Sequence, residues 1–339
     1  MNLLDYTLDE LKSLFKEEGI LEFRADQVLK GIYLGHNIDE ISNIPIVLRG
    51  FLKEKFSIGI PEVVKNLVSK DGTEKFLLKF DDNNIIEVAL MKYFYGNTIC
   101  ISSQIGCRMG CKFCASCIDG LIRNLTSGEM IGEILSVKKF TGQNINKVVI
   151  MGSGEPLDNF DNVLKFIYVS NKEYSLNLGQ RNITLSTCGI VPKIYELARK
   201  KLSINLAISL HATNDDQRIK IMRIAKSYTI NEILEAARYY FKETGRRVTF
   251  EYALIEKVND TKEDADRLSK LLKDIVCHVN VIPINNISNV CFKRPDVKRI
   301  NDFINILIKK GINVTKRREL GKDIEASCGQ LKNSYFAKF

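Results

Sequence analysis

The strongest constraint on the fold is a regular alternation of apolar β-type runs with helical stretches, which begins near residue 98. The runs are TICISS, KVVIMG, RNITLST, INLAISLH, RVTFEYALI, HVNVIPIN and INVTKR. Helical spacing of apolar residues falls between them, near 127–141, 158–171, 190–201, 229–244, 262–275 and 295–310. Such alternation predicts an α/β fold with a parallel sheet and right-handed crossovers, and the apolar runs VVIMG and INLAISL are typical of strands buried on both faces.

The number of repeating units separates two α/β architectures. A closed barrel requires eight βα units, whereas this pattern has about six complete units and one further strand. We therefore predict an incomplete (βα)6 barrel, open on one side, an opening that suits a large substrate. A doubly wound open sheet is the alternative.

The first 95 residues have a different pattern. Apolar residues recur at helical spacing up to about residue 60, and residues 62–95 are β-type runs separated by the turn signals Lys-Asp-Gly and Asp-Asp-Asn. We expect a small accessory domain over residues 1–95, with helices followed by a small antiparallel sheet. The barrel domain would cover residues 96–339 and end in a short C-terminal extension.

Charge and hydropathy restrict the class of protein. The chain has no apolar run long enough for a membrane span, and its acidic, amphipathic N-terminus lacks the layout of a secretory signal. A cytoplasmic location is the expectation. The net charge of +9 favours an anionic partner such as nucleic acid.

Five of the nine cysteines fall between residues 100 and 117. Cys107, Cys111 and Cys114 form the spacing C-x3-C-x2-C, and thiolates are the ligands of iron–sulfur clusters. Three cysteines ligate three of the four irons of a cubane and leave the fourth iron open for chemistry. Catalytic zinc sites likewise keep an open coordination position, whereas structural zinc sites have none. A structural zinc site and a plain electron-transfer cluster are the alternatives, and Cys117 is close enough to be a fourth ligand.

The cysteine segment and the segments after later strands carry a family resemblance. ICISSQIGCRMGCKFCAS, RNLTSGEM, MGSGEPLDN, LSTCGIVP, ISLHA and EASCGQL, taken in order, resemble the RlmN family, which belongs to the radical S-adenosylmethionine superfamily and methylates carbon 2 of adenine in RNA. The likeness extends from about Glu87 to Gln330. It implies that the predicted partial barrel is a radical S-adenosylmethionine barrel.

The resemblance also implies the site residues. Cys107, Cys111 and Cys114 would hold a [4Fe–4S] cluster, and the open iron would bind S-adenosylmethionine. The expected contacts to that cofactor are Gly154, Glu155, Ser186, Ser209, Leu210, His211 and Asn285. Cys188, which replaces a serine usual in the family, is interpreted as a near-isosteric substitution without a redox role.

Three further residues are assigned to catalysis by the same resemblance. Cys328 would carry a methyl group received from one cofactor molecule, and a second molecule would provide a radical that activates this methyl for addition to carbon 2, which is electron-poor. Glu87 would remove the proton from carbon 2 as general base. Thiolate attack by Cys100 on the Cys328 sulfur would release the product and leave a transient disulfide. Without the resemblance, Cys100 and Cys328 would be interpreted as small buried residues.

The implied substrates are 23S rRNA, at the peptidyl transferase centre, and tRNA next to the anticodon. The implied partners also include an external electron donor, flavodoxin-like or similar, but no membrane, and the protein is expected to be a monomer. The basic cluster 316–318, nearest in sequence to Cys328, is favoured for phosphate contact.

Two alternative functions remain at this stage. A Cfr-type enzyme methylates carbon 8 of adenine with the same machinery, although the segment GEPLDN resembles the RlmN family better. An iron–sulfur or zinc protein could instead bind RNA without catalysis.

Overall fold

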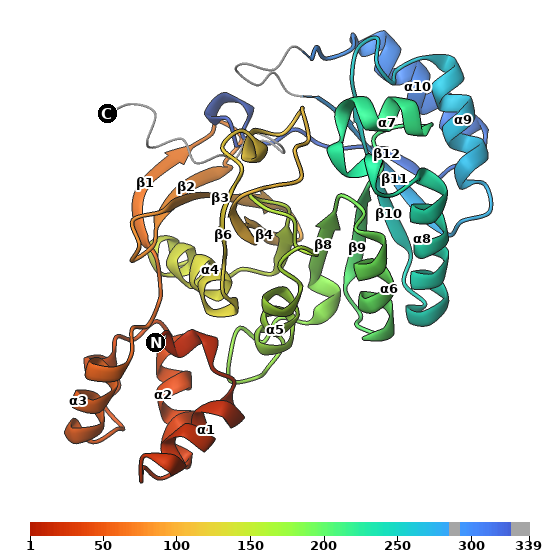
Figure 1. The fold of residues 1–339 in the computed structure, drawn as a ribbon. Coiled ribbons are helices and arrows are strands. Elements are labelled where there is room, and N and C mark those ends of the chain that lie inside the picture. Colours follow the sequence, from red (N-terminus) through yellow and green to blue (C-terminus); the bar gives the residue numbers. More distant parts are fainter. Residues whose placement is uncertain (285–291, 327–339) are drawn as a thin grey trace.

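A ten-stranded sheet in the order β1-β2-β3-β4-β7-β8-β9-β10-β11-β12 organises the computed structural model, which describes residues 1–284 and 292–326 (Figure 1). Its strands are β1 Glu62–Val68, β2 Glu74–Lys79, β3 Ile85–Tyr93, β4 Gly96–Ile101, β7 Lys147–Ile150, β8 Ile183–Thr187, β9 Asn205–Ser209, β10 Val248–Leu254, β11 Cys277–Pro283 and β12 Val314–Lys316. A separate antiparallel pair, β5 Gln104–Gly106 and β6 Leu121–Asn124, follows β4.

The strands from β4 to β12 form the predicted partial barrel. Each pairs in parallel with the next strand of the sheet, in the order of the chain. A doubly wound sheet would reverse its strand order at a switch point, and this order has no reversal. The incomplete barrel is therefore confirmed and the doubly wound alternative is wrong.

Helices cover the outside of the barrel close to the predicted ranges. They are α4 Ser127–Thr141, α5 Phe160–Ser170, α6 Val191–Arg199, α7 Asp215–Ile221, α8 Ile230–Thr244, α9 Lys262–Leu272 and α10 Val297–Lys309. The short helix α7 lies in the β9–α8 connection and was not expected. Every helix in the described parts of the chain falls short of the length and apolarity that a membrane span requires.

Local sequence signals explain where several helices begin and end. Thr126, Thr229 and Thr261 each form a capping box with the acidic residue three positions later, at the starts of α4, α8 and α9. Gly142 and Gly245 end α4 and α8 in the left-handed conformation, which glycine adopts without steric cost. These boundaries are thus encoded within a few residues of each helix end.

The N-terminal part is joined to the barrel through the sheet and the core. The helices α1 Leu8–Glu17, α2 Phe23–Tyr33 and α3 Ile46–Lys55 lie at one end of the molecule (Figure 1). β1, β2 and β3 are antiparallel, as predicted, but β3 also pairs with β4, so they extend the barrel sheet. One hydrophobic core includes Phe15 and Leu29 from the helices and Leu206 and Val281 from the barrel. A domain boundary between residues 95 and 96 stays a prediction, and it would fall in the turn between two paired strands.

The C-terminal extension returns to the β1–β2 turn after leaving β12 (Figure 1). The backbone N–H of Gly321 donates to Asp71 Oδ2 at 2.9 Å, and the N–H of Lys70 donates to Asp323 Oδ2 at 3.2 Å. Ser69 Oγ also donates to Asp323. The hairpin β1–β2 thus holds the segment that leads to the last residues of the chain.

Candidate active site

A cavity of about 1050 Å³, open to solvent, lies at the carboxyl ends of the barrel strands. Successive strands and the loops that follow them supply Gly154 and Glu155 after β7, Ser186 and Cys188 at the end of β8, and Ser209 and His211 at the end of β9. β10, β11 and the residue after β12 add Glu251, Ile282 and Arg317. Parallel strands bring their carboxyl ends to one face of a barrel, so motifs 150 residues apart in the sequence share this cavity.

The three predicted cluster ligands lie in the loop between β5 and β6 and line this cavity. Gly106, with φ +73°, has no room for a side chain, because an added Cβ would overlap the carbonyl oxygen of Gly120. The N–H of Cys107 donates to that same oxygen at 2.8 Å. The β5–β6 pair therefore closes the loop tightly around the cysteines.

Cys117 interacts with all three of these thiols. Hydrogen bonds to Cys117, with burial as the second cause, raise the pKa of Cys107, Cys111 and Cys114, and the same bonds lower the pKa of Cys117. Among the described residues, no three His, Cys, Asp or Glu side chains are poised around a single metal ion. Cys117 therefore stays a candidate fourth ligand beside the three predicted ones. The donor set itself, thiols facing a cavity, fits an iron–sulfur cluster.

Gly154 and Glu155 lie directly against the start of the cysteine segment. An added Cβ at Gly154 would come within 2.6 Å of the Gln104 side chain, so only glycine allows this approach. The N–H of Glu155 donates to Gln104 Oε1 at 2.9 Å. The Glu155 carboxylate accepts from the N–H groups of Cys188, at 2.7 Å, and Leu157, at 3.0 Å. Burial raises the pKa of Glu155, while these hydrogen bonds oppose the rise.

Cys188 lies beside Glu155 in the interior of the protein. Its side chain is buried and hydrogen-bonded to Glu155, and burial raises the pKa of its thiol. A protonated thiol is a poor nucleophile and a poor metal ligand. This placement agrees with the interpretation that Cys188 has no redox role.

Of the three residues expected at the end of β9, two reach the cavity and one does not. Ser209 and His211 line it. Leu210 is fully buried in the hydrophobic core, its N–H donates to the Glu251 carbonyl at 3.1 Å, and its carbonyl accepts from Arg218 Nε at 3.2 Å. The structure therefore brings Leu210 into the core beneath the cavity rather than to its wall.

His211 is held as a neutral ring. Burial, reinforced by the nearby Arg218 guanidinium, lowers the pKa of His211 to about 3. Its Nδ1 accepts from the N–H of Ala253 at 2.8 Å, so the single ring proton of the neutral form lies on Nε2. The ring also contacts Phe113 edge to face, with centroids 4.9 Å apart.

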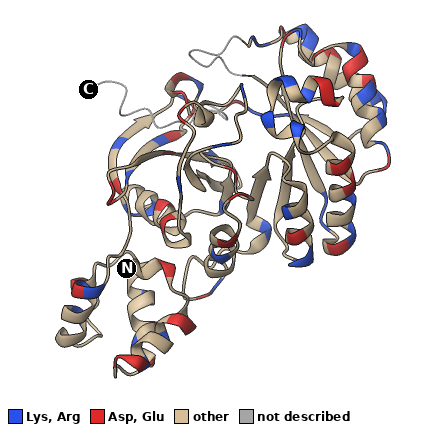
Figure 2. Ribbon diagram, viewed as in Figure 1, with Lys and Arg blue, Asp and Glu red and all other residues tan. Residues whose placement is uncertain are grey.

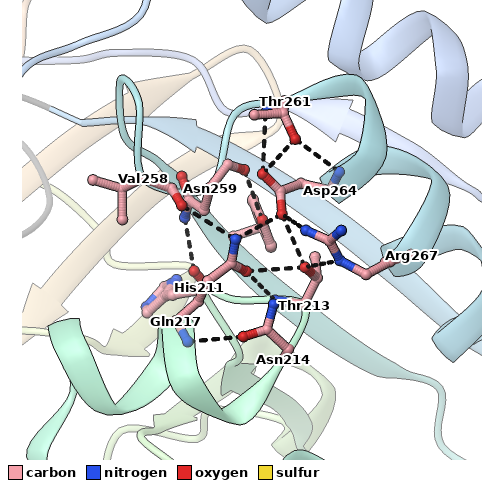
Figure 3. Close-up of polar contacts among 10 residues, drawn as sticks. His211, Thr213, Asn214, Gln217, Val258, Asn259, Thr261, Asp264 and Arg267 are labelled. Carbon is pink, nitrogen blue, oxygen red and sulfur yellow. Dashed lines mark hydrogen bonds and ion pairs between the residues drawn. The ribbon is translucent and has the colours of Figure 1, made fainter.

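The backbone of His211 has the unusual φ of +56°, and a buried polar network fixes it (Figure 3). Asn259 Nδ2 donates to the carbonyls of His211 and Ala253, both at 2.7 Å, and Asn259 Oδ1 accepts from the N–H of Ile255 at 2.7 Å. Two residues further on, Thr213 donates to Asp264 at 3.0 Å. The loops after β9 and β10 are thereby joined by side-chain amides and carboxylates.

Glu251 is a cavity residue that the sequence analysis did not identify, and Arg317, expected only as part of the phosphate-binding cluster 316–318, also lines the cavity. Glu251 is buried, accepts from Asn280 Nδ2 at 3.0 Å and lies 3.7 Å from Arg317 Nη1. Burial raises the pKa of Glu251, and the Arg317 guanidinium opposes the rise. A carboxylate within the apolar run RVTFEYALI was the available signal. Arg317 contacts Met151 Sδ at 3.6 Å, so of the basic cluster 316–318 only Lys316 and Arg318 are exposed.

Cys100 and Glu87 lie beside the cavity rather than on its wall. Cys100 is 8% exposed and packs with Ala89, Ala326 and Met151, and Met151 itself lines the cavity. Glu87 is buried in β3, and Lys75 Nζ lies 3.4 Å from its Oε1. The structure thus gathers the predicted resolving cysteine and the predicted base on adjacent strands. Asn285 and Cys328 lie outside the described residues.

The net positive charge is not gathered on the barrel helices. Figure 2 shows Lys and Arg together with Asp and Glu on α8, α9 and α10. None of these three helices therefore presents a surface of a single charge sign.

Sequence profiles and known proteins match this chain over most of its length. The Radical SAM superfamily profile matches residues 101–271, and the profile of the ribosomal RNA large subunit methyltransferase N-terminal domain matches residues 1–58. A protein of Clostridium botulinum, named probable dual-specificity RNA methyltransferase RlmN, is 58% identical over 98% of this chain and 97% of its own length. The protein of the same name from Clostridium perfringens is 56% identical over 98% of this chain and 97% of its own.

A solved structure has the same fold over the whole chain. The crystal structure of a radical SAM methyltransferase from Sphaerobacter thermophilus is 40% identical and superposes with a TM-score of 0.95, covering 98% of this chain and 99% of the other. The N-terminal helices, the extended sheet and the partial barrel are therefore features that this chain shares with that methyltransferase.

Proposed function

The chain belongs to the RlmN family of radical S-adenosylmethionine RNA methyltransferases, and from this premise we propose that it methylates carbon 2 of adenine. The proposed substrates are 23S rRNA, at the peptidyl transferase centre, and tRNA, next to the anticodon. Carbon 2 of adenine is electron-poor and does not attack an electrophilic methyl group, so the reaction requires radical chemistry.

The observation that carries the proposal is that the predicted cluster ligands and the predicted cofactor contacts face one cavity, at the carboxyl ends of the barrel strands. The loop that contains Cys107, Cys111 and Cys114 lines the same cavity as Glu155. Cys100 lies beside this cavity and packs in a small hydrophobic cluster with Ala326. Ala326 precedes Cys328 by two residues in the sequence. A cysteine that carries a methyl group and a cysteine that releases the product need this proximity.

The [4Fe–4S] cluster and S-adenosylmethionine are the cofactors that the superfamily uses. We propose that Cys107, Cys111 and Cys114 bind the cluster, and that Gly154, Glu155, Ser186, Ser209, His211 and Asn285 bind S-adenosylmethionine. Together these cofactors supply the one-electron chemistry that generates a carbon-centred radical. Glu155 would bind the ammonium group, since it is a carboxylate held by two N–H donors beside the cysteine loop.

The remaining roles fall to residues around Cys100. Cys328 would carry the methyl group, which would give up one hydrogen atom to the radical and become joined to carbon 2 of the base. Glu87 would take the proton that carbon 2 loses, and the one electron left on the adduct would return to the one-electron system that the cofactors supply. The Cys100 thiolate would then attack the Cys328 sulfur. The sulfur–sulfur bond forms as the carbon–sulfur bond breaks, the electron pair leaves with the methylated base, and the product is protonated there.

Two variants test these roles. Cys328→Ala should abolish methylation, because the methyl carrier is absent. Cys100→Ala should accumulate protein covalently joined to RNA, detected as a nuclease-sensitive shift in mass. A Cys100→Ala protein that is free of RNA and has full turnover would remove the resolving role.

Mass spectrometry of adenosines from a deletion strain tests the product. We expect 2-methyladenosine to be absent from 23S rRNA and tRNA and to return when the gene is restored. Loss of 8-methyladenosine instead would replace the proposal with Cfr-type chemistry, and no change in either would leave an RNA-binding protein without this activity.

We propose that the enzyme acts in the cytoplasm, where its ribosomal and transfer RNA substrates are found, and that it is a monomer. An external donor, flavodoxin-like or similar, would supply the electron. Lys316 and Arg318 are exposed beside the cavity residue Arg317, and we propose that they contact RNA phosphates.

A further inference from the structure

Lys75 is a buried lysine that the chemistry described so far does not use. Its side chain is 7% exposed and that of Glu87 is 2% exposed, with 3.4 Å between Nζ and Oε1. Removing a charge of each sign from water costs several kcal/mol per ion in a protein interior. A structural role alone would be met at lower cost by two apolar side chains, so this pair invites a functional explanation.

The strand register places Lys75 and Cys100 on one face of the sheet. Lys75 of β2 pairs with Ala89 of β3, and Ala89 pairs with Cys100 of β4. Directly paired residues share a face, and strands lie about 4.8 Å apart. Glu87 precedes Ala89 by two positions and therefore faces the same way. Ala89, which lies between the lysine and the cysteine across the strands, has a small side chain.

The C-terminal segment contacts the same face at two neighbouring residues. Lys75 Nζ donates to the backbone carbonyl of Glu325 at 3.3 Å, and Ala326 packs against Ala89 and Cys100. Lys75, which belongs to β2, therefore links its own strand to the Glu87 carboxylate in β3 and to the C-terminal segment at Glu325.

We propose that Lys75 is a positioning residue, which holds Glu87 and the segment leading to Cys328 on the sheet face of Cys100. The identities of the base and of the methyl carrier rest on the proposed function. An ammonium group suits this task because it has three donors and no acceptor, so one side chain serves a carboxylate and a carbonyl at once. The anchored carbonyl belongs to the backbone, so it is available whatever side chain residue 325 has.

The first test measures position without RNA. Holoenzyme under anaerobic conditions is treated with diamide, which takes up the two hydrogens as two thiols form a disulfide, and the Cys100–Cys328 peptide pair is followed by mass spectrometry. We expect Lys75→Met to slow this disulfide about tenfold, the loss expected when a hydrogen bond from a charged group no longer holds the two parts together. Lys75→Arg, which keeps the charge and the donors, should restore much of the rate.

Lys92→Met is the matched control. Lys92 Nζ lies 2.9 Å from Glu74 Oε1 in the same β2–β3 hairpin, on the opposite face of the sheet from Lys75. This variant also removes an ammonium–carboxylate pair, and it should form the disulfide at the wild-type rate. If Lys75→Met does not accumulate as folded protein, Lys75→Gln, which keeps a donor without the charge, is measured in its place.

The second test separates positioning from general damage. In single turnover, Lys75→Met should give about tenfold less methylated adenosine for each 5′-deoxyadenosine formed, because the cysteine loop and Glu155 are untouched. A structural defect would lower both products together. Equal loss of both products, or a wild-type disulfide rate in Lys75→Met, would overturn the proposal.

Different measurements test the proposed methylation and the role of Lys75. Wild-type enzyme that makes no 2-methyladenosine would remove the proposed function, whereas the diamide measurement, which needs no RNA, would still report whether Lys75 positions the C-terminal segment.

Discussion

Replacement of Asn259 by alanine is the most direct test of how the barrel shapes its cavity. Asn259 belongs to the loop after β10 and is fully buried (Figure 3). Its amide makes three hydrogen bonds of 2.7 Å, to the carbonyls of His211 and Ala253 and from the N–H of Ile255. Alanine removes all three and leaves three backbone groups without these partners.

The magnitude follows from the groups left behind. An unsatisfied buried polar group costs about 1–3 kcal/mol, and three such groups give at least about 3 kcal/mol at the lower end of that range. The substitution should also affect the cavity, because the left-handed backbone of His211 would lose the donor that holds its carbonyl. We expect S-adenosylmethionine to bind about tenfold more weakly.

Urea unfolding and calorimetric titration measure the two effects. Asn171→Ala is the control, since Asn171 is exposed and its amide makes one bond, to the Leu178 carbonyl at 3.1 Å. We expect it to cost about 1 kcal/mol and to leave cofactor affinity unchanged. An Asn259→Ala protein within about 0.5 kcal/mol of wild type, with unchanged affinity, would refute the view that this amide fixes the His211 backbone.

Three further perturbations have defined outcomes. The pKa of His211 is lowered to about 3, so below about pH 6.5 the unfolded chain binds a proton that the folded chain excludes, and stability falls as pH falls. His211→Gln should reduce this slope by up to about 1.4 kcal/mol per pH unit, measured by urea unfolding, and an unchanged slope would contradict the assignment. Gly106→Ala should lose iron and its visible absorption, because an added Cβ overlaps the Gly120 carbonyl oxygen, whereas Gly142→Ala, at a similar φ with open space, should retain them. Burial raises the pKa of Glu155, so if its carboxylate binds the cofactor ammonium, affinity should increase as pH rises through that pKa, and Glu155→Gln should remove the dependence.

The sequence predicted the barrel because its signals are local. Strand and helix periodicity is legible within a dozen residues, and capping boxes such as Thr229 with Glu232 mark helix starts within four. The sequential order of the βα units then favours a partial barrel, since each right-handed crossover places a strand beside the strand that precedes it in the chain. The gathering of Glu155, Ser186 and His211 at one face followed from the same rule.

Other features depended on side chains that meet across the fold. Glu251, Arg317 and Lys75 are ordinary strand or loop residues in the sequence, and their roles arise from partners 12 to 250 positions away. Leu210, expected at the cofactor, is buried in the core, whereas the neighbouring residues Ser209 and His211 line the cavity. The joining of the antiparallel strands to the barrel sheet likewise depended on the β3–β4 register, which no local pattern specifies.

The cysteine spacing, the strand-end motifs and the alternation of elements were determined by the sequence alone, because each is a short-range property of a few neighbouring residues. Only the tertiary structure decided that Cys117 interacts with the thiols of the three predicted cluster ligands, and that Lys75 links Glu87 to the segment before residue 327. The physical reason is that hydrogen bonds and ion pairs act over about 3–4 Å, a distance that sequence separation does not measure. Cys117 could be suggested as a further ligand because it lies three residues after Cys114 in the sequence. The contact of Lys75 with Glu325 could not be predicted, because the two residues are 250 positions apart.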